Sequence, residues 1–482
     1  MAPGIKEALV SPRGFMTAMN IENYIQKHAG EGGVLEMISM ALPMIVSTAC
    51  DGLMIFTDRY FLAGLGPEYM NAAMGGGVIV QTMMFFFIGL TGYSNALAAQ
   101  YLGSGRRHMS PVAAFQAILI VIAASPILVA CGPPVAALIG GMDIPAEQKA
   151  PQIAYFNILV YGIAIGLLRN CLSCYFSGIG RTRAVMAATI SALLVNVGLD
   201  YVLIFGRFGF PRMGIEGAAI ATLSGGASAL LVLACLYLAK RNRREFSVMK
   251  SFRFDREAMM KLLRFGYPAG IELFLNFLAF SAMILIFHTR GSVVATASTI
   301  MFNWDMVSFI PLLGIEIAVT SLVGRYMGAG RPDIAHRAAM SAIKTGIFYS
   351  ALIFVLFVFI PGRLVLVFSP EGGGDVFTQA YPMAVTMIRI ASLYVLAEAV
   401  MIALIGALRG AGDTFFTMMM SVVAHWTFVP VLYVVLHVLD YSAITGWSLL
   451  VSLFLIFCLA LVVRYRGGKW RDIRVVEVGD FS

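Results

Sequence analysis

Long apolar runs dominate this chain and limit what it can fold into. Hydrophobic residues make up 59% of the sequence and charged residues only 12%, whereas a soluble domain carries about 25% charged residues. With so few charges the chain cannot cover a water-exposed surface, so lipid must be part of its solvent. Because lipid offers no hydrogen bonds to the backbone, only helices or closed barrels can cross it. The runs have helix length and lack the alternating pattern of barrel strands, so the sequence predicts an all-α polytopic membrane protein.

About twelve runs are long enough to cross a bilayer as helices. Short loops that contain Gly or Pro join most of them, as tight helical hairpins require. The third run is interrupted by Pro126, Pro133 and Pro134. The expected spans are residues 37–62, 72–99, 111–139, 153–176, 184–206, 216–239, 262–288, 295–324, 339–361, 381–408, 415–438 and 443–464.

An internal repeat relates the two halves of the chain at a spacing of about 225 residues. Pro43 recurs as Pro268 and Gly66 as Gly291. The longest repeated set pairs Gly89, Leu97, Tyr101, Gly103, Gly105 and Arg106 with Gly314, Leu322, Tyr326, Gly328, Gly330 and Arg331. The repeat unit is therefore a lobe of six spans, and an even number makes both lobes enter the membrane in the same direction. We expect two pseudo-symmetric six-helix lobes around a central cavity, related by an axis along the membrane normal.

Basic residues are distributed unevenly among the expected tails and loops. The tails and every second loop hold about 25 Lys and Arg residues, against about five in the other loops. The positive-inside rule therefore predicts a multi-pass protein of the plasma (inner) membrane with both termini in the cytosol. The net charge of +8 follows mostly from this asymmetry, and without an RNA-binding motif we expect no nucleic-acid partner. The predicted parts are a cytosolic tail 1–36 that could carry a short surface helix, a first lobe 37–239, a cytosolic inter-lobe loop 240–261, a second lobe 262–464 and a cytosolic tail 465–482.

The cysteines all lie inside apolar runs. Cys171 and Cys174 form a CxxC motif, but no second cysteine pair or histidine cluster accompanies it. We therefore expect small buried apolar residues, and neither a disulfide framework, a metal site nor a cofactor. The full set is Cys50, Cys131, Cys171, Cys174, Cys235 and Cys458.

Several polar side chains of the first lobe lie inside expected spans, where charged groups are costly. Asp51 and Asp58 are two helical turns apart on one helix face, and Asn196 and Asp200 are one turn apart. With Thr222 they supply hard oxygen ligands that suit a small cation or a proton. No buried basic partner is evident for Asp58 or Asp200, which favours a function for both. Hydrogen bonds that only hold helices together are the alternative, and are favoured for Asn196 and Thr222 taken alone.

The second lobe carries a different set of acids. At the repeat spacing Asp58 maps onto Met283, so this lobe lacks the first lobe's acid. We expect lobes that share a scaffold and differ in chemistry, one holding the coupling ion and the other receiving cargo or a second ion. Asp413 could instead lie at a cytosolic helix end, and for His425 an interhelical hydrogen bond is favoured over proton relay. The polar residues in question are Glu272, Asn276, Asp305, Glu316, Glu398, Asp413 and His425.

Particular motifs add a family resemblance to this pattern. The most specific are Phe56-Thr57-Asp58-Arg59 with Ala63-Gly64, then residues 100–106, 177–182, 196–200, 214–222, 323–330 and 408–414. With two lobes of six spans, the chain resembles the MATE family of multidrug and toxic-compound extrusion antiporters over nearly all of residues 37–464. The resemblance implies twelve helices in two bundles around a V-shaped cavity. It also implies export of organic cations driven by inward Na⁺ or H⁺.

The resemblance implies roles for particular residues. The family's first-lobe cation site corresponds here to Asp58, Asn196, Asp200 and Thr222. Its second-lobe acids, for substrate or a second ion, correspond to Glu272 and Asp413, and we add Asp51 as a candidate. The expected partners are small organic cations and membrane lipid, and we expect a monomer. Acids outside the family pattern are Asp51, Asp305, Glu316 and Glu398.

Two other functions compete with export. A lipid-linked oligosaccharide flippase of the same superfamily should have extra spans and several cationic residues in the cavity to hold pyrophosphate. Here the buried charges are mainly acidic, which disfavours anionic cargo. A membrane-embedded prenyl or acyl transferase needs paired aspartates for Mg²⁺ or a His/Asp pair at a membrane face, and neither is visible. We therefore expect a transporter and not an enzyme, with Na⁺ and H⁺ both open as coupling ions.

Overall fold

The computed structural model describes residues 30–369 and 374–477, and all of its regular elements are helices. Eleven of the helices are long and apolar enough to cross a membrane, or up to twelve if one bent pair is counted as a single span. The all-α polytopic prediction is therefore confirmed. The surface helix considered for residues 1–36 falls almost entirely outside the described residues.

The first-lobe helices follow the expected spans, with three of the spans divided. The second span is two consecutive helices, the third divides at Cys131, and the fourth bends by 49° at Gly162. A Cβ at Gly162 would lie 2.2 Å from the end of the Leu223 side chain, so glycine lets Leu223 of α11 pack against the bend. The helices are α3 (Val34–Ala63), α4 (Pro67–Gly92), α5 (Ser94–Gly103), α6 (Met109–Ala130), α7 (Gly132–Gly141), α8 (Ala146–Tyr161), α9 (Ile163–Gly178), α10 (Thr182–Phe205) and α11 (Ile215–Tyr237).

The segment between the lobes is partly helical. It contains α12 (Lys240–Phe246) and η1 (Val248–Lys250), and α13 already begins at Arg256. Asp255 caps α13 by accepting a hydrogen bond from the Ala258 amide at 2.9 Å. The second lobe comprises α13 (Arg256–His288), α14 (Ser292–Gly328), α15 (Pro332–Phe359), α16 (Pro361–Leu366), α17 (Asp375–Ala411), α18 (Thr414–Tyr433), η2 (Val434–Val438), α19 (Ala443–Arg466) and η3 (Lys469–Asp472).

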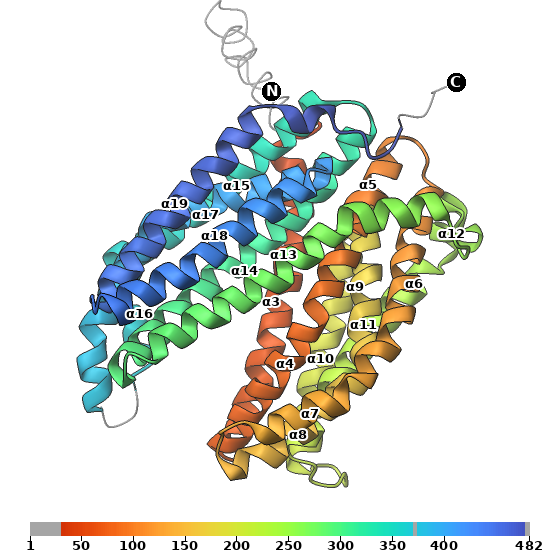
Figure 1. Ribbon diagram of the computed structural model, residues 1–482. Helices are drawn as coiled ribbons and strands as arrows, with labels where there is room; N and C mark the ends of the chain where they lie inside the picture. The colour runs from red at the N-terminus through yellow and green to blue at the C-terminus, as the bar shows by residue number, and fades with distance from the viewer. Residues whose placement is uncertain (1–29, 370–373, 478–482) are drawn as a thin grey trace, which may run out of the picture.

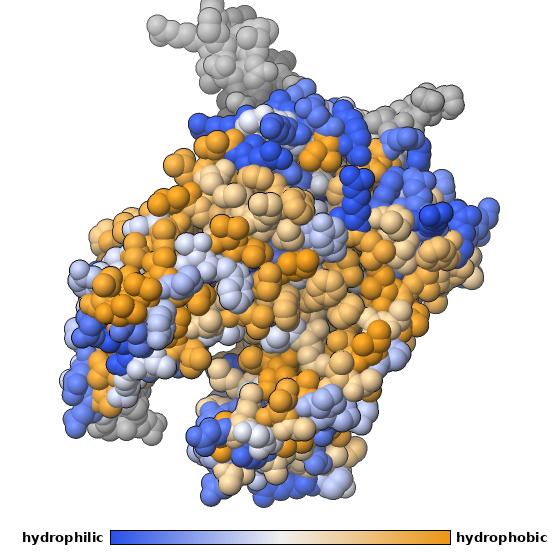
Figure 2. Space-filling model, in the orientation of Figure 1, coloured by the Kyte–Doolittle hydropathy of each residue, from blue (hydrophilic) through white to orange (hydrophobic). Residues whose placement is uncertain are grey.

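The two bundles meet at one end of the molecule and diverge toward the other. They meet where the described chain begins and ends, at the top of Figure 1. Figure 2 shows a cleft between the lobes at the opposite end, and an apolar band between hydrophilic ends. Such a band is what contact with lipid requires, and the cleft matches the expected central cavity.

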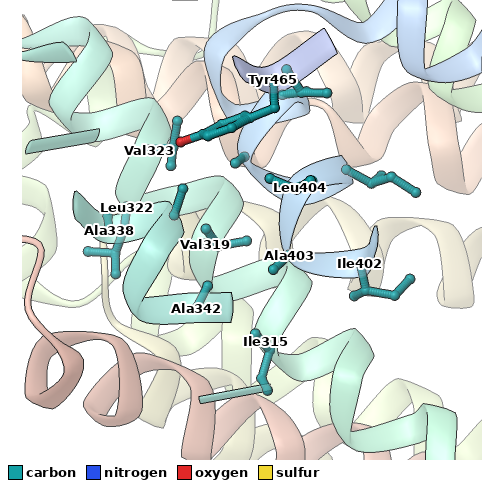
Figure 3. Close-up of a cluster of buried hydrophobic side chains, with 14 of the residues drawn as sticks. Ile315, Val319, Leu322, Val323, Ala338, Ala342, Ile402, Ala403, Leu404 and Tyr465 are labelled. Atoms are coloured by element: carbon teal, nitrogen blue, oxygen red, sulfur yellow. The ribbon is translucent and has the colours of Figure 1, made fainter. Parts of the chain in front are cut away.

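Small side chains allow the second-lobe helices to pack closely. In Figure 3, Ala338 and Ala342 of α15 and Ala403 of α17 lie among Val319 and Ile315 of α14. Lipid is as apolar as these side chains, so close van der Waals packing, and not removal from water, holds such helices together. The cluster therefore fixes α14 against α17, the two helices that carry Asp305, Glu316 and Glu398.

The repeated glycines lie where the lobes touch. A Cβ at Gly103 of α5 would lie 1.8 Å from the Arg325 carbonyl oxygen of α14. Reciprocally, a Cβ at Gly328 would lie 2.1 Å from the carbonyl oxygen of Gln100. The two copies of the repeat motif thus cross backbone to backbone, and only glycine permits this approach. The same reciprocal relation joins Gly89 to Ala269 and Gly314 to Ile45.

Polar contacts close the same end of the molecule. Ser321 of α14 donates a hydrogen bond to Asn95 Oδ1 of α5 at 2.7 Å. Gln100 Nε2 donates to the Gly410 carbonyl of α17 at 2.8 Å. Arg325 forms an ion pair with Glu36 of α3. These contacts and the glycine crossings form one inter-lobe seal, which we call the closed end.

The chain after α19 crosses this closed end from the second lobe to the first (Figure 1). Trp470 is buried in the second-lobe core and stacks on Tyr465, with ring centroids 5.0 Å apart. Five residues later, Val475 and Val476 are buried in the first-lobe core. We call residues 467–477 the C-terminal strap.

The expectation that all six cysteines are buried is wrong for two of them. All are free cysteines, but Cys131 and Cys235 are exposed and Cys174 is half-buried. A helix in a membrane meets an apolar environment on both its protein and lipid faces, so an apolar run alone does not predict burial inside the protein.

Candidate functional site

Asp58 is the centre of a polar pocket between three helices of the first lobe. Its side chain in α3 is only 6% exposed. Asn196 Nδ2 of α10 donates to one carboxylate oxygen at 2.9 Å, and Thr222 Oγ1 of α11 donates to the other at 2.8 Å. Both donors are neutral, so they orient the carboxylate without balancing its charge.

Asp200 adds a second carboxylate to this pocket. The residue is fully buried, and within the described residues neither of its carboxylate oxygens has a well-formed hydrogen bond. It lies close enough to Asp58 for the two carboxyl groups to repel each other, and it also interacts with Asn196. The Asn196 Oδ1 atom likewise lacks a partner among the described residues. The pocket thus presents several oxygens that can take a proton or a small cation.

Close packing of the helices brings these side chains together. A Cβ at Gly225 of α11 would lie 3.0 Å from Asn196 Cβ, and one at Gly217 would lie 2.9 Å from Leu203. Glycine at both positions therefore lets α11 approach α10. The hydroxyls of Ser47 and Thr189 lie 2.7 Å apart and link α3 to α10. The structure thus brings together all four residues of the predicted first-lobe site.

Tyr155 belongs to the same pocket and was missed from the sequence. The tyrosine comes from α8, is 5% exposed, and lies beside Thr222 and both carboxylates. Gly76 of α4 leaves room for its ring, since a Cβ there would lie 3.3 Å from it. The hydroxyl of Tyr155 within an apolar run could have indicated its place in the pocket, but tyrosine is common in such runs and so is a weak indication.

Asp51 does not join this pocket. Arg169 of α9 donates to Asp51 Oδ1 at 2.9 Å, and the two side chains are 26% and 38% exposed. The pairing balances the charge of Asp51, which weakens its candidacy as a site for substrate or a second ion. Arg169 was also missed, although a basic residue within an expected span is as unusual as an acidic one.

Glu272 of the second lobe lies in a charged triad. Arg409 Nη2 of α17 is 3.0 Å from Glu272 Oε2, and Arg409 also pairs with Glu316 of α14. The Glu272 contact is an ion pair by distance but lacks hydrogen-bond geometry, so we treat it as the looser of the two. Glu272 is 2% exposed. With two acids and one base, the triad keeps an excess negative charge.

Asp413 has a different partner from Glu272. It lies at the start of α18, where Arg464 of α19 donates to its Oδ2 atom from Nε and Nη2 at 3.0 and 2.9 Å. Among the described residues no hydrogen bond or ion pair joins it to Glu272. The structure therefore does not bring together the two acids of the expected second-lobe site. Asp413 lies at the end of a helix, which was the alternative expected for it.

His425 also differs from the expectation of an interhelical hydrogen bond. Its Nδ1 atom lies 2.8 Å from the Ser421 carbonyl oxygen of its own helix, α18. The interhelical bonds come from its neighbours. Trp426 Nε1 donates to the Leu275 carbonyl of α13 at 3.2 Å, and Asn276 Nδ2 donates to Ser421 Oγ at 2.7 Å.

Comparison with known proteins gives several matches. The MatE family profile matches residues 43–202 and 268–434. "Multidrug resistance protein PmpM" of Pseudomonas aeruginosa is 27% identical over 398 residues, which are 81% of each chain. "Probable multidrug resistance protein NorM" of Thermotoga maritima is 25% identical over 461 residues, covering 94% of this chain and 97% of that protein.

Solved structures share the fold. A MOP superfamily transporter from Pyrococcus furiosus superposes with a TM-score of 0.83 at 18% identity, covering 93% of this chain and 99% of that one. A multidrug resistance MATE family transporter in an outward-facing conformation gives the same score at 19% identity and the same coverage. The profile covers more than half of the chain, and the relatives and the fold agree with it. The chain belongs to the MATE family of membrane transporters.

Proposed function

We propose that this protein is a secondary active antiporter that exports cationic or amphipathic drugs and other toxic organic compounds in exchange for Na⁺ or H⁺. One observation carries the coupling part of the proposal. Asp58 and Asp200 share a buried pocket, and among the described residues neither carboxyl group forms a hydrogen bond or an ion pair with a basic side chain. Such a pair binds a proton or Na⁺ strongly, because a positive charge relieves the repulsion between buried carboxylates.

We further propose that the closed end faces the cytosol and the cleft faces outward. The excess of Lys and Arg in the tails and alternate loops supports this orientation. The protein then lies in the plasma (inner) membrane with both termini in the cytosol. It works as a monomer, because a single chain supplies both lobes and the cleft between them (Figure 2). Its role is that of a carrier and not of an enzyme.

The charges in the spans argue against an anionic cargo. Arg169, Arg409 and Arg464 come from span helices and contact candidate residues, and each of them is paired with an acid. A flippase for pyrophosphate-linked lipids needs cationic side chains that are free to bind phosphate. The excess of acid in the triad around Glu272 favours a cationic substrate instead.

The test is dye efflux from proteoliposomes. The purified protein is reconstituted, and efflux of a cationic dye is measured under a Na⁺ gradient or a pH gradient, each imposed alone. We expect one gradient to drive efflux, and Asp200→Asn to abolish it. The matched control is Asp143→Asn, which changes an exposed acid in the turn between α7 and α8. Efflux that ignores both gradients, or that survives in Asp200→Asn, would contradict the proposal.

A further inference from the structure

A pocket of about 540 Å³ lies at the closed end, on the side of the first lobe. Its walls come from the beginning of α3, the turn between α9 and α10, and the junction of α11 with α12. A Cβ at Gly180 in this wall would lie 4.0 Å from Nη1 of Arg325, which belongs to the inter-lobe seal. Figure 1 shows α12 at this end of the molecule. The pocket has the size of a small-molecule site, and none of the acids discussed above lines it.

The lining of this pocket is basic. Among the described residues it contains three arginines, Arg181, Arg183 and Arg241, and no acid. Arg183 of α10 and Arg241 of α12 are exposed, and within the described chain neither side chain forms an ion pair or a hydrogen bond. Arginine binds phosphate oxygens strongly because its guanidinium group presents paired N–H donors. Two guanidinium groups are therefore free to bind an anion at the pocket.

The third arginine is fixed in place by its neighbours. Arg181 pairs with Glu245 of α12 and donates from Nη1 to Asn242 Oδ1 at 3.1 Å. Its guanidinium group also lies over the Phe246 ring, 5.4 Å from the ring centroid. Asn242 is buried and donates to the Tyr237 carbonyl at 2.9 Å. These contacts hold the turn before α10 against α12, so the wall of the pocket is formed without a ligand.

The helix next to the arginines presents apolar side chains to lipid. Leu231, Cys235 and Leu238 of α11 are exposed and lie four and three residues apart, so they share one helix face. In a membrane span, such a face contacts lipid. Leu236, in the last turn of the same helix, is exposed and lines the pocket. The pocket therefore lies where the apolar band gives way to the hydrophilic end in Figure 2.

We propose that this pocket binds the phosphate headgroup of an anionic phospholipid, whose acyl chains lie along the exposed face of α11. Arg183 and Arg241 bind the phosphate oxygens, and Arg181 adds positive charge from the fixed wall. The observation that selects a lipid over free phosphate is that the arginines adjoin a lipid-facing apolar surface, so the ligand carries an anion on an apolar body. A zwitterionic headgroup gains less, because it brings a cation of its own toward the arginines.

Native mass spectrometry of the purified full-length protein tests the assignment by counting bound lipids. The protein in detergent is titrated with phosphatidylglycerol, or with phosphatidylcholine that has the same acyl chains. We expect one phosphatidylglycerol molecule to bind more tightly than any that follow, and phosphatidylcholine to show no such step. Arg183→Gln and Arg241→Gln should each weaken this first step about fivefold, and together about 25-fold. Arg183→Lys and Arg241→Lys keep the charge and should retain most of the binding.

The matched control removes the same charge from the same end of the molecule. It combines Arg107→Gln with Arg244→Gln, two exposed arginines outside the pocket, and should leave the first step unchanged. Thermal unfolding without added lipid should be the same in all of these variants, since the replaced side chains are exposed.

Three results would overturn the proposal. The first is equal binding of the two lipids, or an unchanged first step when both pocket arginines are replaced. The second is an equal loss in the control pair, because binding would then reflect only the overall positive charge of this end. The third is displacement of the lipid by an equal concentration of inorganic phosphate, because the site would then take free phosphate. No drug and no gradient enters the measurement, so these outcomes are independent of the proposed transport function.

Discussion

The glycine crossing at the closed end predicts how the two lobes can be forced apart. Replacing Gly328 by alanine places a Cβ 2.1 Å from the Gln100 carbonyl oxygen, and replacing Gly103 places one 1.8 Å from that of Arg325. Normal contact needs about 3.5 Å, so the backbones must separate by about 1.5 Å. Alanine is a better helix former than glycine, so the helices themselves are not weakened. Each alanine substitution therefore weakens the contact between the lobes and not the helices themselves.

The free-energy change can be taken from the cost of overpacking. Backbone atoms cannot rotate away as a side chain can, so we take the upper part of the usual range, about 2–3 kcal/mol for each substitution. This corresponds to a shift of about 30- to 160-fold in the ratio of open to closed molecules. Conformational states of one protein commonly differ by only a few kcal/mol. Either alanine should therefore produce a measurable population opened at this end.

Electron paramagnetic resonance distance measurements provide the assay. Nitroxide labels are placed at His108 and Asp333, two exposed positions on opposite lobes at the closed end, in a background without the native cysteines. We expect a longer second distance to appear in Gly103→Ala and in Gly328→Ala. The control is Gly92→Ala, whose Cβ would meet no atom within 4 Å. Unchanged distances in both crossing variants, or an equal change in the control, would refute the reasoning.

The remaining predictions concern coupling, cargo and topology. Asp58→Asn and Asp200→Asn should each abolish gradient-driven dye efflux from proteoliposomes while thermal unfolding stays near wild type, and the double variant should be little worse because the two act as a unit. Glu272→Gln should weaken binding of cationic drugs by about tenfold and of uncharged analogues much less, as measured by direct binding. Equal losses would assign Glu272 a scaffold role. A cysteine at position 143 should react with impermeant reagents from outside intact cells, whereas one in the loop 240–261 should not. External labelling of that loop would contradict the proposed topology.

Most residues of the first-lobe pocket could be predicted from the sequence. Four polar residues lie in apolar spans, and because polar groups are costly in lipid each was expected to face the protein interior. They are Asp58, Asn196, Asp200 and Thr222. Helical spacing placed Asn196 and Asp200 on one face, and the family resemblance linked that face to Asp58. Periodicity within one helix does not show which face of another helix it meets, so their meeting in one pocket needed the three-dimensional arrangement.

The ion pairs could not be predicted in the same way. Arg169 and Arg409 balance acids on other helices, and their pairing depends on how each helix is rotated about its own axis. Helical spacing shows which residues share a face of one helix, such as Asp51 and Asp58. It does not show that Asp51 forms an ion pair with Arg169 of another helix. The separation of Asp413 from Glu272 has the same cause, because Arg464 comes from the last helix of the chain.

The C-terminal strap limits how far the lobes can travel at the closed end. Its anchors, Trp470 in one lobe and Val476 in the other, are six residues apart, and a fully extended chain of that length reaches about 21 Å. While both anchors stay buried, the strap sets a maximum distance between the two lobes at the closed end. A wider excursion has to pull Trp470 or the valines out of their pockets, which exposes apolar surface and creates a restoring force. Wide opening at the closed end therefore has a free-energy cost that widening of the cleft at the other end does not have, even though the two lobes are built on the same repeat.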